Sequence, residues 1–294
     1  MCKQASQPVN YRSYHGSPMP EPATTKFESQ SYETLLLSRP SEYVLQVTLN
    51  RPDAANAMNT QLGLDLLALF DELAQEPADI RCVVLTGAGS KAFCAGGDLG
   101  WMREQFHADR ATRMAEARKL AEMLRVLNEL PKPLIGRVQG QAFGGGIGMM
   151  SVCDTAVAVE GAKFGLTEVR LGLIPATISP YVLARMGEGK ARRVFMSARI
   201  FGSEEARDLD LVAKVVSPEG LDAAVEAEAK PYLGAAPRAV ADAKALARSL
   251  GPDISDAVID DSIRRLADTW ETPEAQEGIS AFFEKRKPQW VTAS

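Results

Sequence analysis

Two glycine-rich segments of this 294-residue sequence combine residue types that could do chemistry without a reactive side chain. They are residues 93–99 (FCAGGDL) and 140–148 (GQAFGGGIG), and each follows a predicted strand. Consecutive glycines at the start of a helix expose backbone N–H groups where the helix dipole favours negative charge. Such segments could bind an anion or stabilise a developing oxyanion. The alternative interpretation is that these glycines only permit tight turns and close packing.

A third segment, residues 163–175 (KFGLTEVRLGLIP), places the single acid Glu168 among apolar residues. A carboxylate in an apolar cleft has its charged form disfavoured, so its pKa would rise towards the range that suits general acid–base catalysis. The alternative is a surface glutamate paired with Arg170, and residue type alone favours that alternative.

Other chemistries are excluded by what the sequence lacks. Neither glycine-rich segment contains a GxGxxG or GxxxxGK[ST] pattern after a strand, which argues against dinucleotide and P-loop sites. His15 and His107 are the two histidines, so a zinc site with several histidine ligands is excluded and we expect no metal. No GxSxG elbow is present, and we expect His107 to be a solvated loop residue rather than a catalytic base.

Charge and composition restrict the partners and the compartment. With 33 Lys and Arg against 38 Asp and Glu, the net charge is −5, which argues against a nucleic-acid partner. The four cysteines form no CxxC pair, which favours a reducing compartment, and we expect a cytoplasmic protein. No run approaches the roughly 18 apolar residues of a membrane span. Residues 1–30 lack apolar periodicity and are expected to be a disordered leader.

The elements that would position these segments alternate between strands and helices. Alternating apolar residues predict a strand at 43–49, and short apolar runs predict strands at 80–85, 134–138 and 155–159. Asn59 and Asp109 are placed to cap helices whose apolar residues recur on one face. This order predicts an α/β fold with a well-buried sheet.

The last third of the chain is predicted to be mainly helical, with one strand-like insertion. Helical spacing covers residues 178–198, 203–209, 219–233, 236–250, 254–270 and 273–286, and the insertion is residues 211–216. The Leu- and Ala-rich faces of these helices indicate either subunit contacts or an internal helical cap.

Five motifs in order resemble the enoyl-CoA hydratase/isomerase (crotonase) family. They are residues 51–57 (RPDAANA), 93–99, 140–146, 164–168 (FGLTE) and 282–286 (FFEKR), and the resemblance extends from about residue 32 to residue 290. It implies a spiral of ββα units over residues 31–200. It also implies a helical region over residues 201–294 that serves oligomerisation and CoA contacts, usually in a trimer or a dimer of trimers.

The resemblance assigns roles to individual residues. The backbone N–H groups of Gly97 and Gly145 would form an oxyanion hole around an acyl-CoA thioester carbonyl, and Glu168 would be the catalytic acid–base. Coenzyme A would belong to the substrate, and no further cofactor is implied. The CoA-binding positions would be Arg51, Ala54, Ala57, Gly96, Asp98 and Leu99, together with Phe282 and Lys285 reaching a neighbouring subunit's CoA.

One position departs from the family pattern. Typical hydratases carry a second glutamate one turn into the helix after the triple glycine, and this chain has Gly148 there. The segment 174–180 (IPATISP) resembles the bacterial 3-methylglutaconyl-CoA hydratase branch. Such a substrate has a second carboxylate, for which Arg103 and Arg170 are the candidate contacts.

The sequence therefore supports one leading hypothesis and two alternatives. The leading hypothesis is hydration of a branched 2-enoyl-CoA, 3-methylglutaconyl-CoA of leucine breakdown in particular. The first alternative, which Gly148 motivates, is isomerisation of a 3-enoyl-CoA with Glu168 as the proton shuttle. The second is an inactive acyl-CoA-binding protein.

Overall fold

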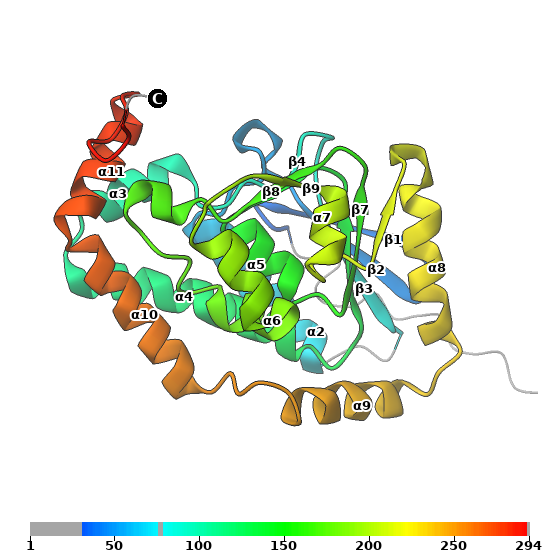
Figure 1. The fold of residues 1–294 in the computed structure, drawn as a ribbon. Helices are drawn as coiled ribbons and strands as arrows, with labels where there is room; N and C mark the ends of the chain where they lie inside the picture. The colour runs from blue at the N-terminus through cyan, green and yellow to red at the C-terminus, as the bar shows by residue number, and fades with distance from the viewer. Residues whose placement is uncertain (1–30, 76–78, 293–294) are drawn as a thin grey trace, which may run out of the picture.

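The structure, a computed structural model, describes residues 31–75 and 79–292 (Figure 1). The expected leader, residues 1–30, lies outside the described residues, as do Cys2 and His15. Within the part that is described, no helix has the length and apolar character needed to cross a membrane.

The main sheet has six strands and confirms the predicted α/β fold. Their order is β1 (Leu35–Ser41), β2 (Val44–Leu49), β3 (Cys82–Gly87), β5 (Leu134–Val138), β7 (Thr155–Val159) and β10 (Lys214–Val216). β1 and β2 are antiparallel and every other pair is parallel. The four predicted strands coincide with β2, β3, β5 and β7. β1 was not predicted, because this edge strand contains Pro40 and is mostly exposed or half-buried.

A second, smaller sheet carries the chain to the glycine-rich segments. It consists of β4 (Ala92–Cys94), β6 (Gln141–Phe143), β8 (Lys163–Gly165) and β9 (Phe201–Gly202). Three times the chain passes from a strand of the main sheet to a strand of the small sheet and then into a helix, which is the expected spiral of ββα units. These strands have only two or three residues each, too few for a period-two pattern to reveal them.

Helices cover the main sheet and connect the units. They are η1 (Pro52–Ala54), α2 (Thr60–Gln75), α3 (Leu99–His107), α4 (Arg110–Glu129), α5 (Gly145–Ser151), η2 (Glu168–Leu171), α6 (Ser179–Phe195), α7 (Ser203–Asp208) and η3 (Pro218–Gly220). Both predicted caps are confirmed: Asn59 Oδ1 accepts from Leu62 N at 3.0 Å and Asp109 Oδ1 from Thr112 N at 2.8 Å.

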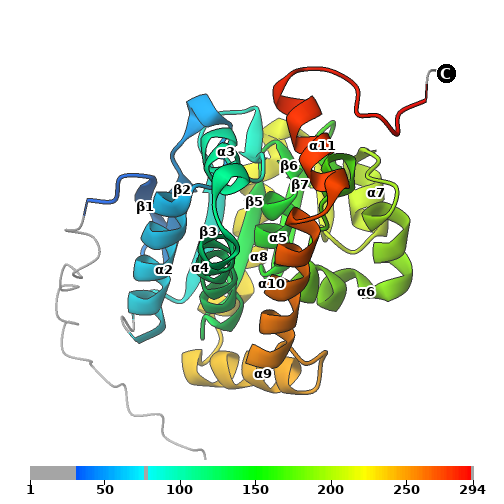
Figure 2. The same cartoon turned by 90° about the vertical axis from the view of Figure 1, so that its left-hand side faces the viewer.

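The C-terminal helices form an arm that runs across the molecule (Figures 1 and 2). They are α8 (Leu221–Leu233), α9 (Pro237–Ser249), α10 (Asp256–Trp270) and α11 (Pro273–Phe283), as the helical spacing predicted. α9 buries none of its residues, whereas α10 packs against α4 and α11 against η2. β10 lies within the predicted strand-like insertion at 211–216 and pairs with β7, so the main sheet extends beyond residue 200.

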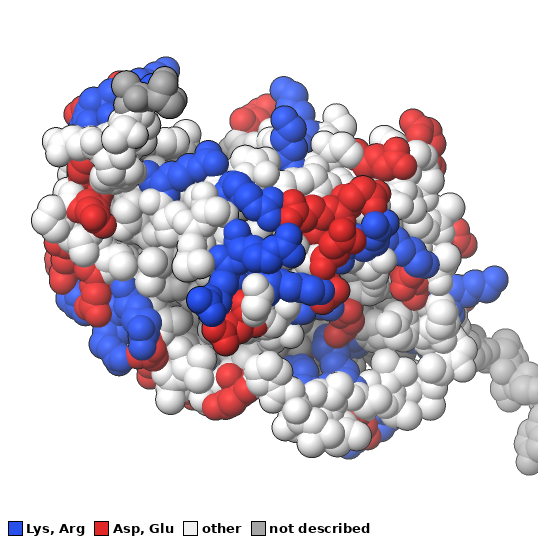
Figure 3. All heavy atoms as spheres, viewed as in Figure 1, with Lys and Arg blue, Asp and Glu red and all other residues white. Residues whose placement is uncertain are grey.

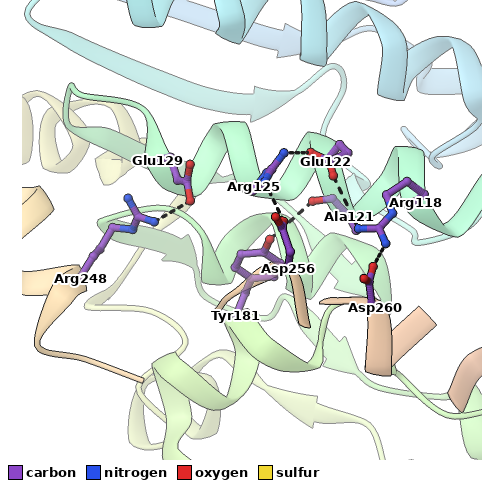
Figure 4. A network of polar contacts seen from close by, with 9 residues as sticks. All are labelled: Arg118, Ala121, Glu122, Arg125, Glu129, Tyr181, Arg248, Asp256 and Asp260. Carbon is purple, nitrogen blue, oxygen red and sulfur yellow. Dashed lines mark hydrogen bonds and ion pairs between the residues drawn. The ribbon is translucent and has the colours of Figure 1, made fainter. Parts of the chain in front are cut away.

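Ion pairs fix the arm to α4 (Figure 4). Arg118 pairs with Asp260, and Arg125 pairs with Asp256 at 3.0 Å, so two contacts join α4 to α10. A third pair, between Glu129 and Arg248 at 2.9 Å, joins α4 to α9. These contacts hold α9 and α10 against α4.

Basic side chains on the face around α6 and α7 are interspersed with acidic ones (Figure 3). Lys190 pairs with Asp210, and Arg193 and Arg199 both pair with Glu205. The positive charge on this face is therefore locally neutralised.

Candidate active site

An apolar cavity of about 170 Å³ lies where the three chemistry-bearing segments meet. Its lining comes from α2, α3, α4, α5, η2, α10 and the segment after η2. The polar and charged side chains in the lining are Asn59, Thr60, Trp101, Glu116, Lys119, Glu168 and Thr177. The cavity thus combines a mostly hydrophobic wall with a few polar groups, as small-molecule sites do.

The first glycine-rich segment is bound to the backbone of Met58, two residues before α2. Met58 N donates to Gly96 O at 2.7 Å, and Asp98 N donates to Met58 O at 2.8 Å, so Gly97 is fixed between two backbone hydrogen bonds. Asp98 then caps α3 by accepting from Gly100 N at 2.8 Å. The N–H of Gly97 itself donates to no acceptor among residues 31–75 and 79–292, and Gly97 lines the cavity.

The second glycine-rich segment packs directly on the first. Gly96 has a φ of +93°, and a Cβ at this position would lie 2.9 Å from Phe143 O. A Cβ on Gly146 would lie 2.2 Å from Cys94 O. Only residues without a side chain permit this approach.

Gly145 follows at the first position of α5, where an N–H has no intrahelical partner. Within the described part of the chain this N–H has no acceptor, and Gly145 lines the cavity together with Gly97. The structure therefore brings the two predicted N–H groups to one cavity, at an end where the helix dipole favours negative charge.

Glu168 begins η2 and reaches the same place. Its Oε1 lies 3.0 Å from the point that a Cβ on Gly144 would occupy, and its Oε2 is buried without a hydrogen-bond partner in the described chain. Desolvation by burial raises the pKa of Glu168 to about 7. The alternative of a surface glutamate paired with Arg170 is wrong, since Arg170 is exposed and Glu168 makes no ion pair with a described residue.

The C-terminal helix α11 holds the short helix that carries Glu168. A Cβ on Gly172 would lie 2.5 Å from the backbone of Glu274, and one on Gly278 would lie 2.5 Å from the backbone of Leu171. η2 and α11 are therefore in backbone contact. The helical region thus fixes the position of η2, the helix that begins at Glu168.

The position of the second acid is filled by another side chain. A Cβ on Gly148 would lie 2.5 Å from Ile178 Cγ2 and 2.9 Å from Ile178 Cβ. A glutamate at position 148 would overlap Ile178, whose side chain is buried. Ile178 thus fills the space that a glycine at position 148 leaves free.

On the wall that α2 and α4 form, the polar groups are paired with one another. Glu116 accepts from Lys119 Nζ at 2.6 Å, from Thr60 Oγ1 at 2.8 Å and from Trp101 Nε1 at 3.4 Å. Burial, the largest single effect, raises the pKa of Glu116, but these hydrogen bonds together leave it below its ordinary value. Glu116 is therefore held in its charged form.

The predicted CoA-binding residues lie outside the cavity lining. Arg51 pairs with Asp98 at 2.9 Å and also donates to Ala57 O. The buried Asn56 fixes this turn by accepting from Arg51 N and donating to Ala88 O and Ala92 O. Ala54 ends η1 and is half-buried, and Ala57 is buried. Leu99, Phe282 and Lys285 are exposed.

The two predicted contacts for a distal carboxylate do not line the cavity. The Arg103 guanidinium lies over the Phe283 ring, 4.9 Å from its centroid, and Arg170 is exposed. Lys119 is the one Lys or Arg among the described residues that line the cavity. Sequence reasoning missed it because Lys119 looks like any solvated residue of an amphipathic helix.

Other lining residues were also missed. Leu266 and Trp270 of α10 lie more than 90 residues from Glu168 in the chain, and helical spacing does not reveal which helix they meet. Thr177 and Ile178 belong to the IPATISP segment, whose unusual composition was the available signal. His107 ends α3, contacts Phe106 edge to face and does not line the cavity. Among the residues described, no group of three or more His, Cys, Asp or Glu could hold a metal ion.

Comparison with known proteins gives matches along most of the chain. The family model for enoyl-CoA hydratase/isomerase matches residues 39–293. The short-chain-enoyl-CoA hydratase of Clostridium acetobutylicum is 34% identical over 83% of this chain and 92% of its own. The (E)-benzylidenesuccinyl-CoA hydratase of Thauera aromatica is 32% identical over 84% of this chain and 95% of its own. Among solved structures, an enoyl-CoA hydratase from Shewanella pealeana has a TM-score of 0.73 and 36% identity, covering 91% of this chain and 100% of its own.

Proposed function

This chain is an enzyme that belongs to the enoyl-CoA hydratase/isomerase family, and we propose that it adds water to the double bond of a 2-enoyl-CoA thioester. One observation carries the proposal. The backbone N–H groups of Gly97 and Gly145, which have no acceptor among the described residues, line the same apolar cavity as Glu168, whose Oε2 has no partner there either.

The proposed mechanism gives each of these groups a role. The thioester carbonyl accepts hydrogen bonds from Gly97 N–H and Gly145 N–H, and Glu168 takes a proton from water while the water oxygen bonds to the β-carbon. The π electrons move to the carbonyl oxygen as an enolate, which the two N–H groups stabilise by about 3 to 4 kcal/mol each. The enolate collapses, and the α-carbon takes the proton from Glu168, so that one water is added in total.

We further propose 3-methylglutaconyl-CoA, an intermediate of leucine breakdown, as the substrate. This thioester has a free carboxylate at the end of its acyl group, and Lys119 supplies a cation in the cavity lining. An ammonium has three donors, and Glu116 accepts one of them in the structure. The relative from Thauera aromatica is named for a succinyl thioester, which also carries a second carboxylate.

The test is direct incubation of the purified protein with 3-methylglutaconyl-CoA. We expect 3-hydroxy-3-methylglutaryl-CoA to form, with one oxygen derived from labelled water. Glu168→Gln is the control, because it removes the base at nearly constant volume. Comparable turnover by this variant would exclude Glu168 from the mechanism.

The same experiment separates hydration from isomerisation. Isomerisation of a 3-enoyl-CoA needs one proton shuttle. Position 148 carries no carboxylate, and Ile178 occupies the space into which one would project, which favours isomerisation. An isomerase would convert a 3-enoyl-CoA without incorporating labelled oxygen. Binding without turnover across both substrate types would instead support an acyl-CoA-binding role.

The remaining proposals concern assembly, cofactors and location. We propose a homo-oligomer, a trimer or a dimer of trimers, in which the C-terminal helices make subunit contacts and Phe282 and Lys285 approach a neighbour's CoA. Hydration does not change the oxidation state of the acyl-CoA as a whole, so the proposed reaction requires no redox cofactor. The free, buried Cys82, Cys94 and Cys153 are compatible with the cytoplasm as the location.

A further inference from the structure

Thr177 carries a buried hydroxyl group that forms no hydrogen bond with any described residue. The residue is 5% exposed, and its Oγ1 atom is buried in the lining of the active-site cavity. Within that lining, Glu168 Oε2 is the other buried side-chain oxygen without a partner. Buried polar atoms are almost always paired, so two unpaired oxygens in one cavity indicate a missing polar ligand.

The local fold does not use the Thr177 hydroxyl. The turn before α6 is closed by backbone bonds from Ala176 N to Ile174 O at 2.8 Å and from Ser179 N to Ala176 O at 3.0 Å. The Ser179 hydroxyl donates to Pro175 O and completes this turn. A threonine whose hydroxyl neither caps the helix nor closes the turn has no evident structural role there.

Thr177 is also the chain neighbour of the residue that fills the place of the absent second acid. The following residue, Ile178, occupies the space into which a side chain at position 148 would project. Of the two polar residues that flank Ile178 in the chain, Thr177 lines the cavity, whereas Ser179 does not and donates its hydroxyl to Pro175 O. A hydroxyl has one donor and two acceptor positions, and it can accept a hydrogen from water without taking a net charge.

We propose that Thr177 is the second group that holds the reacting water, opposite Glu168. This role rests on the proposed hydratase function. Glu168 accepts the proton that leaves the water, while Thr177 Oγ1 accepts a hydrogen bond from the hydrogen that stays on the oxygen. The water oxygen is thereby aimed at the β-carbon, and one carboxylate suffices for the reaction.

The proposal predicts that stability and activity respond in opposite directions to Thr177→Val. Valine has nearly the same shape and lacks the hydroxyl, so it removes an unpaired buried polar group. We expect a melting temperature equal to or above that of the wild type. We expect kcat for hydration to fall about tenfold or more, with KM changed by less than about threefold, because a hydrogen bond to the reacting water is lost. Thr177→Ser, which keeps the hydroxyl, should retain most of kcat.

Thr86→Val is the matched control. Thr86 is also buried, at 3% exposure, but its hydroxyl donates to Arg137 O at 2.9 Å, outside the cavity. Its replacement should lower the melting temperature and leave kcat close to the wild-type value. The two valine variants should therefore show opposite signatures in the same pair of measurements.

Three results would overturn the proposal. Undiminished hydration by Thr177→Val would exclude the hydroxyl from the reaction. A lower melting temperature together with equal losses of kcat in the Val and Ser variants would indicate a packing role instead. A wild-type protein that binds 2-enoyl-CoA but hydrates none would overturn the proposed function, and with it the role of Thr177, whereas the first two results leave the hydratase function intact.

Discussion

The two polar walls of the cavity differ in how far their groups are satisfied. On the wall of α2 and α4, Glu116 accepts hydrogen bonds from Lys119, Thr60 and Trp101. On the wall of α5 and η2, Glu168 Oε2 has no partner, and the N–H groups of Gly97 and Gly145 have no acceptor within the described chain.

This difference separates positioning from chemistry. A saturated group is held in one protonation state and one orientation, which suits substrate selection. An unpaired group keeps its capacity for a ligand, and desolvation raises the pKa of Glu168 to about 7, whereas the pKa of Glu116 lies below its ordinary value. The proposed mechanism therefore gives the two carboxylates of the cavity different tasks, which follow from their different environments.

The proposed difference between the two walls is tested most strongly by neutralising the carboxylates of Glu168 and Glu116 in turn. We expect Glu168→Gln to lower kcat about 100- to 10,000-fold, since it removes the general acid–base. Glu116→Gln should change mainly KM, because it disturbs the pairing of Lys119 and not the proton transfer. Steady-state kinetics of both variants measure this difference, and equal losses of kcat would show that the walls are not functionally distinct.

The pH dependence of activity tests the raised pKa. The base must be ionised, so we expect kcat/KM to rise about tenfold per pH unit below pH 7 and to level off above it. If kcat/KM instead levels off near pH 4.5, Glu168 is solvated in the free enzyme and its pKa is not raised.

The same pKa also makes stability depend on pH. Since the pKa of Glu168 is about 7 in the folded chain and about 4.5 when unfolded, the wild type loses stability as pH rises between these values. Glu168→Gln does not titrate, so its stability advantage should be near zero at pH 4 and reach about 3 kcal/mol above pH 7. Urea unfolding of both proteins across this range provides the measurement.

Restoring the second acid should damage the fold rather than improve catalysis. Gly148→Glu would overlap Ile178, and overpacking of this kind costs about 1 to 3 kcal/mol. The added substitution Ile178→Ala should recover part of that loss, measured by thermal unfolding. Gly189→Glu, at an exposed position with no atom within 4 Å of the added Cβ, is the control and should be nearly neutral. Full stability of Gly148→Glu alone would show that the site can relax around a second carboxylate.

The smallest expected effect concerns substrate selection by Lys119, on the wall of α2 and α4 where the polar groups are paired with one another. Lys119→Met should lower kcat/KM for 3-methylglutaconyl-CoA about fivefold, which corresponds to about 1 kcal/mol for one ion pair that is partly exposed to solvent. It should leave the value for crotonyl-CoA, which has no distal carboxylate, within about twofold. An equal loss for both thioesters would remove Lys119 from substrate selection and leave it a structural partner of Glu116.

Much of the fold could be predicted from the sequence, because periodicity reports burial. The strands β5 and β7 and the caps Asn59 and Asp109 coincide with their predictions. The small sheet could not be predicted, since its strands are too short to show a period.

The site could be predicted only in part. Motif order identified Gly97, Gly145 and Glu168, which line one cavity. The contact of Ile178 with position 148 and the pairing of Lys119 with Glu116 depend on tertiary packing, about which local sequence is silent. Charge alone indicates Arg103 and Arg170 as contacts for a distal carboxylate, and charge does not tell which way a side chain points.

The most direct measurement of the central claim is a crystal structure with a non-reactive 2-enoyl-CoA analogue bound. We expect the thioester oxygen to lie within about 3 Å of both Gly97 N and Gly145 N, with the Glu168 carboxylate facing the α- and β-carbons. A thioester oxygen bound to water or to a side chain, with either amide left unpaired, would contradict the account.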